Sequence, residues 1–188
     1  MSGTITDAVG DGPSAETDFG EFSWTISGEE LTFLMDMPNL IQPIPVNRPG
    51  INPGFPEYEW SVQIDVDNDP YTGTPSTSLG EGADYKLSIS YFHSFSSSDL
   101  LYLNQMQWDL WEYSEANGFW ESVATPDLTA PPLDNAFQIV GTVPGLDAQS
   151  KLMPFTFYSE PFTSFFIPDT FGDCFLENTD RVFSDAFE

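Results

Sequence analysis

Apolar and polar side chains alternate along much of this chain. Phe22, Trp24 and Ile26 lie two residues apart, and the alternation resumes at Leu31 after Gly28. A period of two is typical of β-strands that bury one face, and a glycine between two such segments favours a tight turn. We therefore expect an antiparallel hairpin in this part of the chain.

The same signal recurs, and glycine, proline or asparagine separates most of the segments. Further strands are expected at residues 3–6, 58–66, 83–92, 101–113, 119–123, 136–143 and 155–159. The 101–113 strand carries apolar residues on both faces, so a bulge is expected near Asp109, and Asn117-Gly118 predicts the next hairpin turn. No segment has a sustained helical period. The sequence thus predicts an all-β fold, an antiparallel, jelly-roll-like β-sandwich.

Proline marks the irregular parts. Six prolines fall within residues 38–56, so neither a helix nor a central strand is expected there. We expect a long surface loop that is either functional or a plain crossover between sheets, and a second loop over residues 125–133. From residue 161 the alternation fades. A sandwich domain is expected over residues 1–167, with an irregular tail over 168–188 that packs on the sandwich or donates a strand.

The strong net negative charge of the chain disfavours some classes of binding partner. The 188 residues include 30 acidic and 4 basic side chains, a formal net charge of −26. Such a field opposes binding to phosphate backbones and to an anionic membrane surface, so neither nucleic acid binding nor membrane insertion is expected. Since 40% of the chain is hydrophobic, it is not a disordered acidic tail. The acidity instead points to cation binding, to a salty medium that screens it, or to solubility alone.

The densest acidic segment is the run IDVDNDPYTG that begins at Ile64. Its Asp-x-Asp-x-Asp spacing starts like an EF-hand loop. However, Pro70 stands where that loop requires glycine, and Ser76 stands where it requires glutamate. The segment is therefore not an EF-hand.

A site built across a strand corner fits these residues better. Asp65 and Asp67 point to one face of a strand, and Asp84 arrives at the start of the next strand. Hard cations prefer such clusters of oxygen ligands, so we expect calcium. The expected ligands are Asp65, Asp67, Asn68, Asp69, the carbonyl of Tyr71, and Asp84. The alternative is a solvated acidic turn in which Asp and Asn serve turn geometry alone.

Catalytic chemistry has little support in the sequence. The one histidine, His93, lies just past the end of its expected strand, and Cys174 has no local partner. No Gly-x-Ser-x-Gly elbow occurs, and zinc would need nitrogen and sulfur ligands that are nearly absent. Glu57 and Glu59, two residues apart on one strand, could serve a carboxylate glycoside hydrolase, which stays a remote alternative.

The order of motifs resembles a module of secreted bacterial proteins. Its elements are DAVGD at residues 7–11, Asp18, IDVDN at 64–68, TG at 72–73 and GADY at 82–85. Together they are similar to the DOMON-like and family 9 carbohydrate-binding-module-like β-sandwiches. Over residues 3–160 the resemblance implies a jelly-roll-like sandwich, export, a structural calcium and a binding rather than catalytic role. It assigns metal ligation to Asp67, Asn68 and Asp84, and it makes Asp11 and Asp18 a second acidic cluster.

The resemblance leaves the ligand open. The chain departs from haem-binding relatives, because no axial pair of methionine and histidine can be placed. A glycan would stack on aromatic side chains, although tryptophans more often belong to a core. The tryptophans expected to contact such a ligand are Trp60, Trp108, Trp111 and Trp120.

Export is the expected fate of the chain. A single cysteine permits no intrachain disulfide, and no apolar run is long enough to cross a bilayer. Met1 leads straight into strand-like sequence without an apolar leader, as in a mature domain whose leader has been replaced. The ending RVFSDAFE is similar to an "IFxDGFE" terminus of exported proteins in some gammaproteobacteria, with Ala186 in place of glycine.

Two functional hypotheses follow. The first is a secreted, non-catalytic binding module stiffened by calcium, with a carbohydrate as the expected ligand. The alternative is a self-assembling extracellular surface or filament protein, in which residues 3–9 or 155–187 add a strand to the sheet edge of a neighbouring copy.

Overall fold

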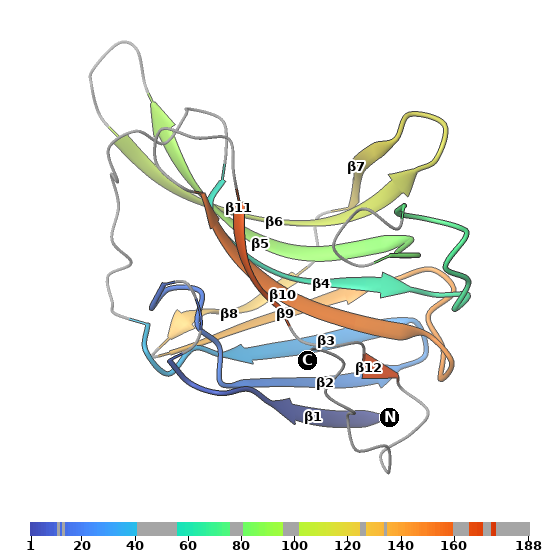
Figure 1. Ribbon diagram of the computed structural model, residues 1–188, viewed down its shortest axis with the longest axis horizontal. Coiled ribbons are helices and arrows are strands. Elements are labelled where there is room, and N and C mark those ends of the chain that lie inside the picture. Colours follow the sequence, from blue (N-terminus) through green and yellow to red (C-terminus); the bar gives the residue numbers. More distant parts are fainter. Residues whose placement is uncertain are drawn as a thin grey trace, which may run out of the picture.

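The chain folds as two antiparallel β-sheets that lie face to face (Figure 1). The computed structural model describes residues 1–10, 12, 14–40, 56–75, 81–95, 102–124, 127–133, 135–159, 166–170 and 174–175. Within these ranges the regular structure is entirely β. The prediction of an all-β sandwich is confirmed.

Each sheet draws strands from both halves of the chain. The five-stranded sheet has the order β1 (Ser2–Thr6), β2 (Glu21–Ser27), β3 (Glu30–Asp36), β9 (Ala136–Thr142), β8 (Asp127–Leu133). The seven-stranded sheet has the order β11 (Phe166–Thr170), β10 (Lys151–Ser159), β4 (Pro56–Asp65), β5 (Tyr85–Phe95), β6 (Tyr102–Ser114), β7 (Phe119–Ala124), and β12 (Cys174–Phe175) also pairs with β10.

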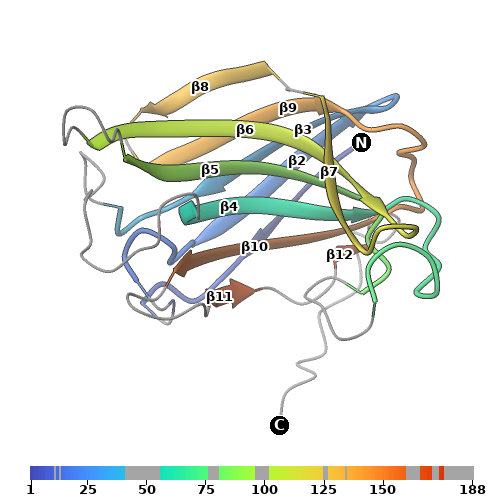
Figure 2. The same ribbon diagram turned by 90° about the horizontal axis from the view of Figure 1, so that it is seen from above.

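The chain passes between the two sheets three times, from β3 to β4, from β7 to β8 and from β9 to β10 (Figure 2). Strand β3 pairs with β9, and β4 pairs with β10. The first and third crossings therefore start from two neighbouring strands of the five-stranded sheet and lead to two neighbouring strands of the seven-stranded sheet. Strands that are far apart in the sequence are thus wound together into one β-sandwich.

The opening hairpin forms as the alternation predicts. Its register places Phe22 opposite Met35 and Trp24 opposite Phe33, and these side chains all point into the core. Gly28 adopts a φ of 63° in the turn, a left-handed conformation that suits glycine.

Trp60 lies at the centre of the core. Its side chain is fully buried and stacks on Phe137 of the facing sheet, with ring centroids 4.1 Å apart. Its indole Nε1 donates a hydrogen bond of 2.7 Å to the carbonyl of Glu16. The expectation that Trp60 contacts an external ligand is therefore wrong, because no face of the ring is open to solvent.

The prediction of a loop at residues 125–133 is wrong, because residues 127–133 form strand β8. This strand pairs with β9 only at intervals, and the register shifts twice. Pro131 and Pro132 cannot donate hydrogen bonds to a ladder, but an edge strand tolerates this loss on its open side. The prolines thus indicate an edge rather than a loop.

The strand expected at residues 155–159 is not the last one. It belongs to the longer β10, and both β11 and β12 pair with β10 farther along the chain. Strand β11 spans the expected boundary at residue 167, so the sheet continues beyond it. Residues 176–188, most of the expected tail, lie outside the described residues.

Two local expectations are refined. Strand β6 pairs with β5 without interruption through Asp109, and its register shift occurs against β7 between Leu110 and Trp111. His93 lies inside β5 rather than beyond it. The proline-rich loop falls almost wholly within residues 41–55, outside the described part of the chain.

Candidate metal centre

The acidic segment forms a corner between β4 and β5. The N–H of Asp84 donates to the carbonyl of Ile64 at 2.9 Å. In return, the N–H of Val66 donates to Asp84 Oδ2 at 3.0 Å. These two bonds hold the residue before β5 against the end of β4, as the sequence predicts for Asp84.

The turn between the two strands is built from its own side chains. Asp67 Oδ1 accepts the N–H of Asp69 at 2.9 Å, and the hydroxyl of Thr72 donates to the same oxygen at 3.2 Å. Asn68 takes a left-handed φ of 55°, which asparagine tolerates better than most residues. The turn thereby curls the Asp67 carboxylate back toward the strand ends.

Gly73 permits the close approach that completes the corner. Its φ is 67°, and a Cβ at this position would lie 2.3 Å from the carbonyl oxygen of Ala83. No side chain fits in that space. The glycine therefore lets the segment before Asp84 pack directly on the turn.

Three carboxylates converge at this corner. One oxygen from each of Asp65, Asp67 and Asp84 lies within 4.8 Å of the others. Asp65 is 1% exposed, and its Oδ1 is buried with no hydrogen-bond partner among the described residues. A buried polar atom without a partner destabilises the fold. A cation bound to this oxygen would offset that cost. The group could hold a metal ion.

The surroundings disfavour the ionised form of these acids. Burial raises the pKa of Asp65, and it raises the pKa of Asp84 to about 6, helped by the charges of Asp67 and Asp65. The folded pKa of each acid thus lies above its unfolded value. In the metal-free protein the associated stability is present at acidic pH and is lost as the pH rises toward and through 6.

Two further charges flank the group. Lys151, opposite Asp65 in the β4–β10 register, lowers the pKa of Asp65 and opposes the effect of burial. Glu115, just after β6, accepts the N–H of Gly73 at 3.1 Å, and its charge raises the pKa of Asp84. Sequence reasoning missed Glu115, although the N–H of Tyr113 donates to the carbonyl of Asp84 and so places the end of β6 beside the corner.

The remaining expected ligands lie outside this group of carboxylates. Asp69 Oδ1 accepts the N–H of Tyr71 at 3.0 Å, Asn68 is exposed, and the Tyr71 side chain is 94% exposed. Their part in ligation, including that of the Tyr71 carbonyl, stays a prediction.

Asp18 is engaged in holding a loop. It is buried and accepts the N–H groups of Gly10 and Gly12 at 2.9 and 3.0 Å. The side-chain amide of Asn39 donates to its other oxygen. These bonds connect the loop after β1 to the segment after β3. Asp11, its expected companion, lies outside the described residues.

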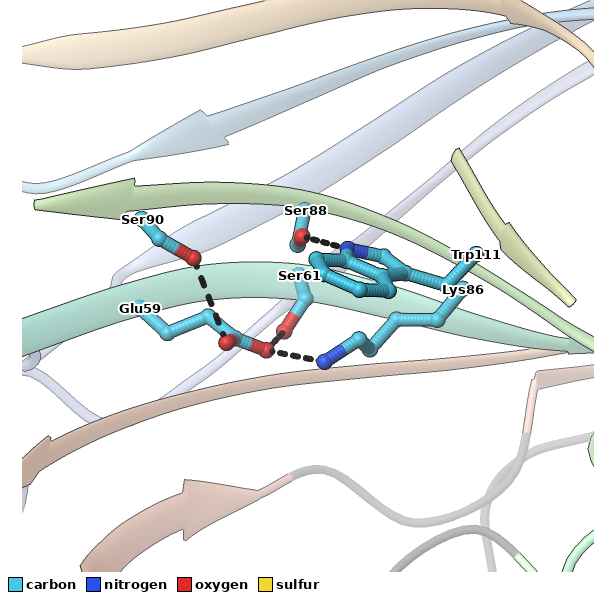
Figure 3. A network of polar contacts seen from close by, with 6 residues as sticks. All are labelled: Glu59, Ser61, Lys86, Ser88, Ser90 and Trp111. Carbon is cyan, nitrogen blue, oxygen red and sulfur yellow. Dashed lines mark hydrogen bonds and ion pairs between the residues drawn. The ribbon is translucent and has the colours of Figure 1, made fainter. Parts of the chain in front are cut away.

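A polar network occupies the face of the seven-stranded sheet that points away from the core (Figure 3). Lys86 Nζ lies 3.0 Å from Glu59 Oε1, which also accepts the hydroxyl of Ser61. The same ammonium lies 5.5 Å from the ring centre of Trp111 and 5.7 Å from that of Trp120, close enough for cation–π attraction.

Of the two glutamates considered for a glycoside hydrolase, Glu57 and Glu59, the structure describes the side chain of Glu59 only. Glu59 is buried and paired with Lys86, an arrangement that neutralises its charge within the fold. The side chain of Glu57 lies outside the described part. Trp108 points to the opposite face of β6 and packs against the core, whereas Trp111 and Trp120 are only half-buried.

The fold and corner define an all-β sandwich with a three-carboxylate group between neighbouring strands. No family model, curated protein or solved structure matches this chain. The resemblance to DOMON-like and family 9 carbohydrate-binding-module-like proteins therefore stays a prediction. Within the described ranges, no helix is long and apolar enough to cross a membrane.

Proposed function

We propose that this protein is a non-catalytic binding module whose β4–β5 corner holds a calcium ion. The observation that carries the proposal is the buried Oδ1 of Asp65, which has no hydrogen-bond partner among the described residues and lies beside the carboxylates of Asp67 and Asp84. All three groups offer oxygen, the ligand type that calcium prefers, and calcium accepts the irregular geometry of a turn more readily than magnesium does.

The ion would act as a clamp in the fold. Its ligands come from the last residue of β4, from the turn, and from the residue before β5. Burial, and after it the charges of the neighbouring carboxylates, raise the pKa values of Asp65 and Asp84, and a divalent cation offsets both effects. Binding therefore stabilises the folded chain by mass action, because the unfolded chain does not assemble the group.

Export is part of the same proposal. A site of three carboxylates in an open turn, one of them exposed, belongs with the weaker calcium sites. Such sites fill at the concentrations of about 0.1–1 mM that extracellular modules use. A strongly acidic chain with a weak calcium site suits a compartment rich in calcium and salt.

Isothermal titration calorimetry on chelator-treated protein tests the metal proposal. We expect calcium to bind saturably, and magnesium to bind more weakly because it gives up its water reluctantly. Titration at about pH 5 should weaken calcium binding, because protons compete for Asp84, whose pKa is raised to about 6.

For the ligand of the module we propose a carbohydrate on the outer face of the seven-stranded sheet. Trp111 from β6 and Trp120 from β7 are half-buried on this face, so part of each ring is open for stacking. Hydroxyl and carboxylate groups lie beside them, including Ser122, which donates to Asp109 at 3.1 Å. Aromatic surface next to hydrogen-bonding groups fits a sugar ring, which has apolar faces and polar edges.

Affinity electrophoresis through a panel of soluble polysaccharides tests the carbohydrate proposal. At least one polysaccharide should retard the protein, and Trp111→Ala or Trp120→Ala should weaken this binding about tenfold or more. Phe119→Ala is the matched control, because Phe119 is exposed but adjoins Trp120 on the opposite face of β7. The proposal fails if no polysaccharide retards the protein, or if all three variants bind like the wild type.

A further inference from the structure

The edge strand β1 differs from the other edges of the two sheets. Edge strands usually carry charges, prolines or bulges that prevent pairing with another chain. Strand β8 contains Asp127 and two prolines, β11 contains Pro168, and β7 contains Glu121 and pairs through a register shift. Strand β1, SGTIT, has no charge and no proline, and its pairing with β2 is regular.

Among the described residues, the backbone groups on the outer edge of β1 have no partner strand. The N–H of Asp7 donates to Gly20 and that of Ile26 donates to Met1, so the odd-numbered residues of β1 bond to β2. By the alternation of an antiparallel ladder, the N–H and C=O of Ser2, Thr4 and Thr6 point the other way. Within the part of the chain that the structure describes, no strand pairs with this edge.

We propose that two copies of this protein associate through β1, antiparallel about a two-fold axis at Thr4. In this register Thr4 pairs with Thr4 of the partner subunit, and Ser2 pairs with Thr6 of the partner subunit. Every outward N–H and C=O of the three residues then has a partner. The register is complementary to itself, as a two-fold interface requires.

The side chains fit the same register. On the core side, Gly3 lies opposite Ile5 of the partner subunit, so no two large side chains meet. Gly3 has no room for a larger group, because a Cβ would lie 2.3 Å from the ring of Trp24. On the outer side, threonine faces threonine, a favourable cross-strand pair.

Charge also favours a second copy at this edge. With a net charge of −26, two copies repel each other most where acidic side chains meet. The outer surface beside β1 is a shallow hollow lined by uncharged residues, among them Ser23, Thr25, Thr32 and Leu34. Contact at β1 thus keeps acidic groups apart, and added salt should strengthen it by screening the remaining repulsion.

This association differs from strand donation. The expected donor at residues 3–9 includes β1, which is already paired within its own sheet, and β10 lies between β4 and β11. Edge pairing about a two-fold axis gives a closed dimer rather than a filament. It does not depend on calcium, because the proposed metal site lies in the other sheet.

Sedimentation velocity over a wide concentration range tests the dimer on the full chain. We expect a reversible monomer–dimer equilibrium that is unchanged by chelator and shifts toward dimer as salt increases. Thr4→Pro removes the outward N–H without breaking a bond to β2, and it should raise the dissociation constant at least about tenfold. Thr4→Lys should do the same by placing like charges opposite each other.

Thr25→Lys is the matched control, since it adds the same charge on the same face one strand inward. It should dimerise more strongly than Thr4→Lys. Amide exchange gives a second readout: the Thr4 amide should become protected as concentration rises, whereas the inward Gly3 amide should not change. A protein that stays monomeric at millimolar concentration in high salt, or equal dimerisation by the two lysine variants, overturns the proposal.

Discussion

Replacing Trp60 with alanine is expected to lower the free energy of unfolding by about 4 kcal/mol. The side chain is fully buried, stacks on Phe137 across the two sheets and bonds to the carbonyl of Glu16. Its removal leaves a large cavity and an unpaired carbonyl. Chemical denaturation monitored by circular dichroism measures the loss.

Two further variants separate the causes of this effect. Trp60→Phe keeps most of the buried ring and removes the indole N–H, so it should cost about 1–3 kcal/mol. Trp120→Ala removes a half-buried ring that packs edge-on against Tyr113 and should cost only about 1 kcal/mol. A loss for Trp60→Ala no larger than that for Trp120→Ala would contradict the placement of Trp60 at the centre of the core.

The variant Asp65→Asn is expected to abolish the effect of calcium on thermal stability. In the wild type, calcium at about 100 times its dissociation constant should stabilise the fold by about 2.7 kcal/mol. This corresponds to a rise in melting temperature of roughly 5–10 °C for a chain of this size. In chelator at neutral pH the variant should melt at or above the wild type, because it lacks a buried charge whose pKa is raised.

Asp147→Asn is the control for this pair of melts. Asp147 is an exposed turn aspartate that accepts the N–H of Gln149 at 2.7 Å and lies outside the three-carboxylate group, so the same change of charge should leave the calcium response intact. In chelator, any advantage of Asp65→Asn should shrink as the pH falls below 3.8, the ordinary pKa of this carboxyl, because the wild-type group then becomes protonated in both the folded and the unfolded state. An equal calcium response in wild type and Asp65→Asn would argue against the corner as the site.

The sequence predicts best where local pattern and final environment agree. In the β2–β3 hairpin, alternation, a turn glycine and the buried face all indicate the same register, so Phe22 and Phe33 are placed correctly. Strand β8 fails because its prolines oppose central pairing, whereas the fold uses it at an edge. Whether a proline-containing segment lies at a sheet edge depends on which distant strands pair with it. Local propensity holds no information on that pairing.

The candidate metal site likewise combines residues that the local sequence predicts with features that depend on distant strands. Asp65 and Asp84 are foreseeable because a strand end, a turn and a strand start must lie together. The burial of Asp65 is not foreseeable in this way, because it depends on both neighbouring strands covering β4. Glu115 enters through the β5–β6 register, which sets how the end of β6 meets the corner. Aromatic content likewise cannot separate Trp60 in the core from Trp111 on the outer face, since both lie in segments predicted to be strands.

Calorimetric titration of calcium into metal-free wild type and Asp65→Asn is the decisive test of the proposed metal site. We expect saturable binding of a single ion per chain in the wild type at neutral pH, and no saturable binding in the variant. Wild-type protein that shows no saturable binding of calcium, or a variant that binds it as tightly as the wild type, would contradict the claim that Asp65, Asp67 and Asp84 form a calcium site.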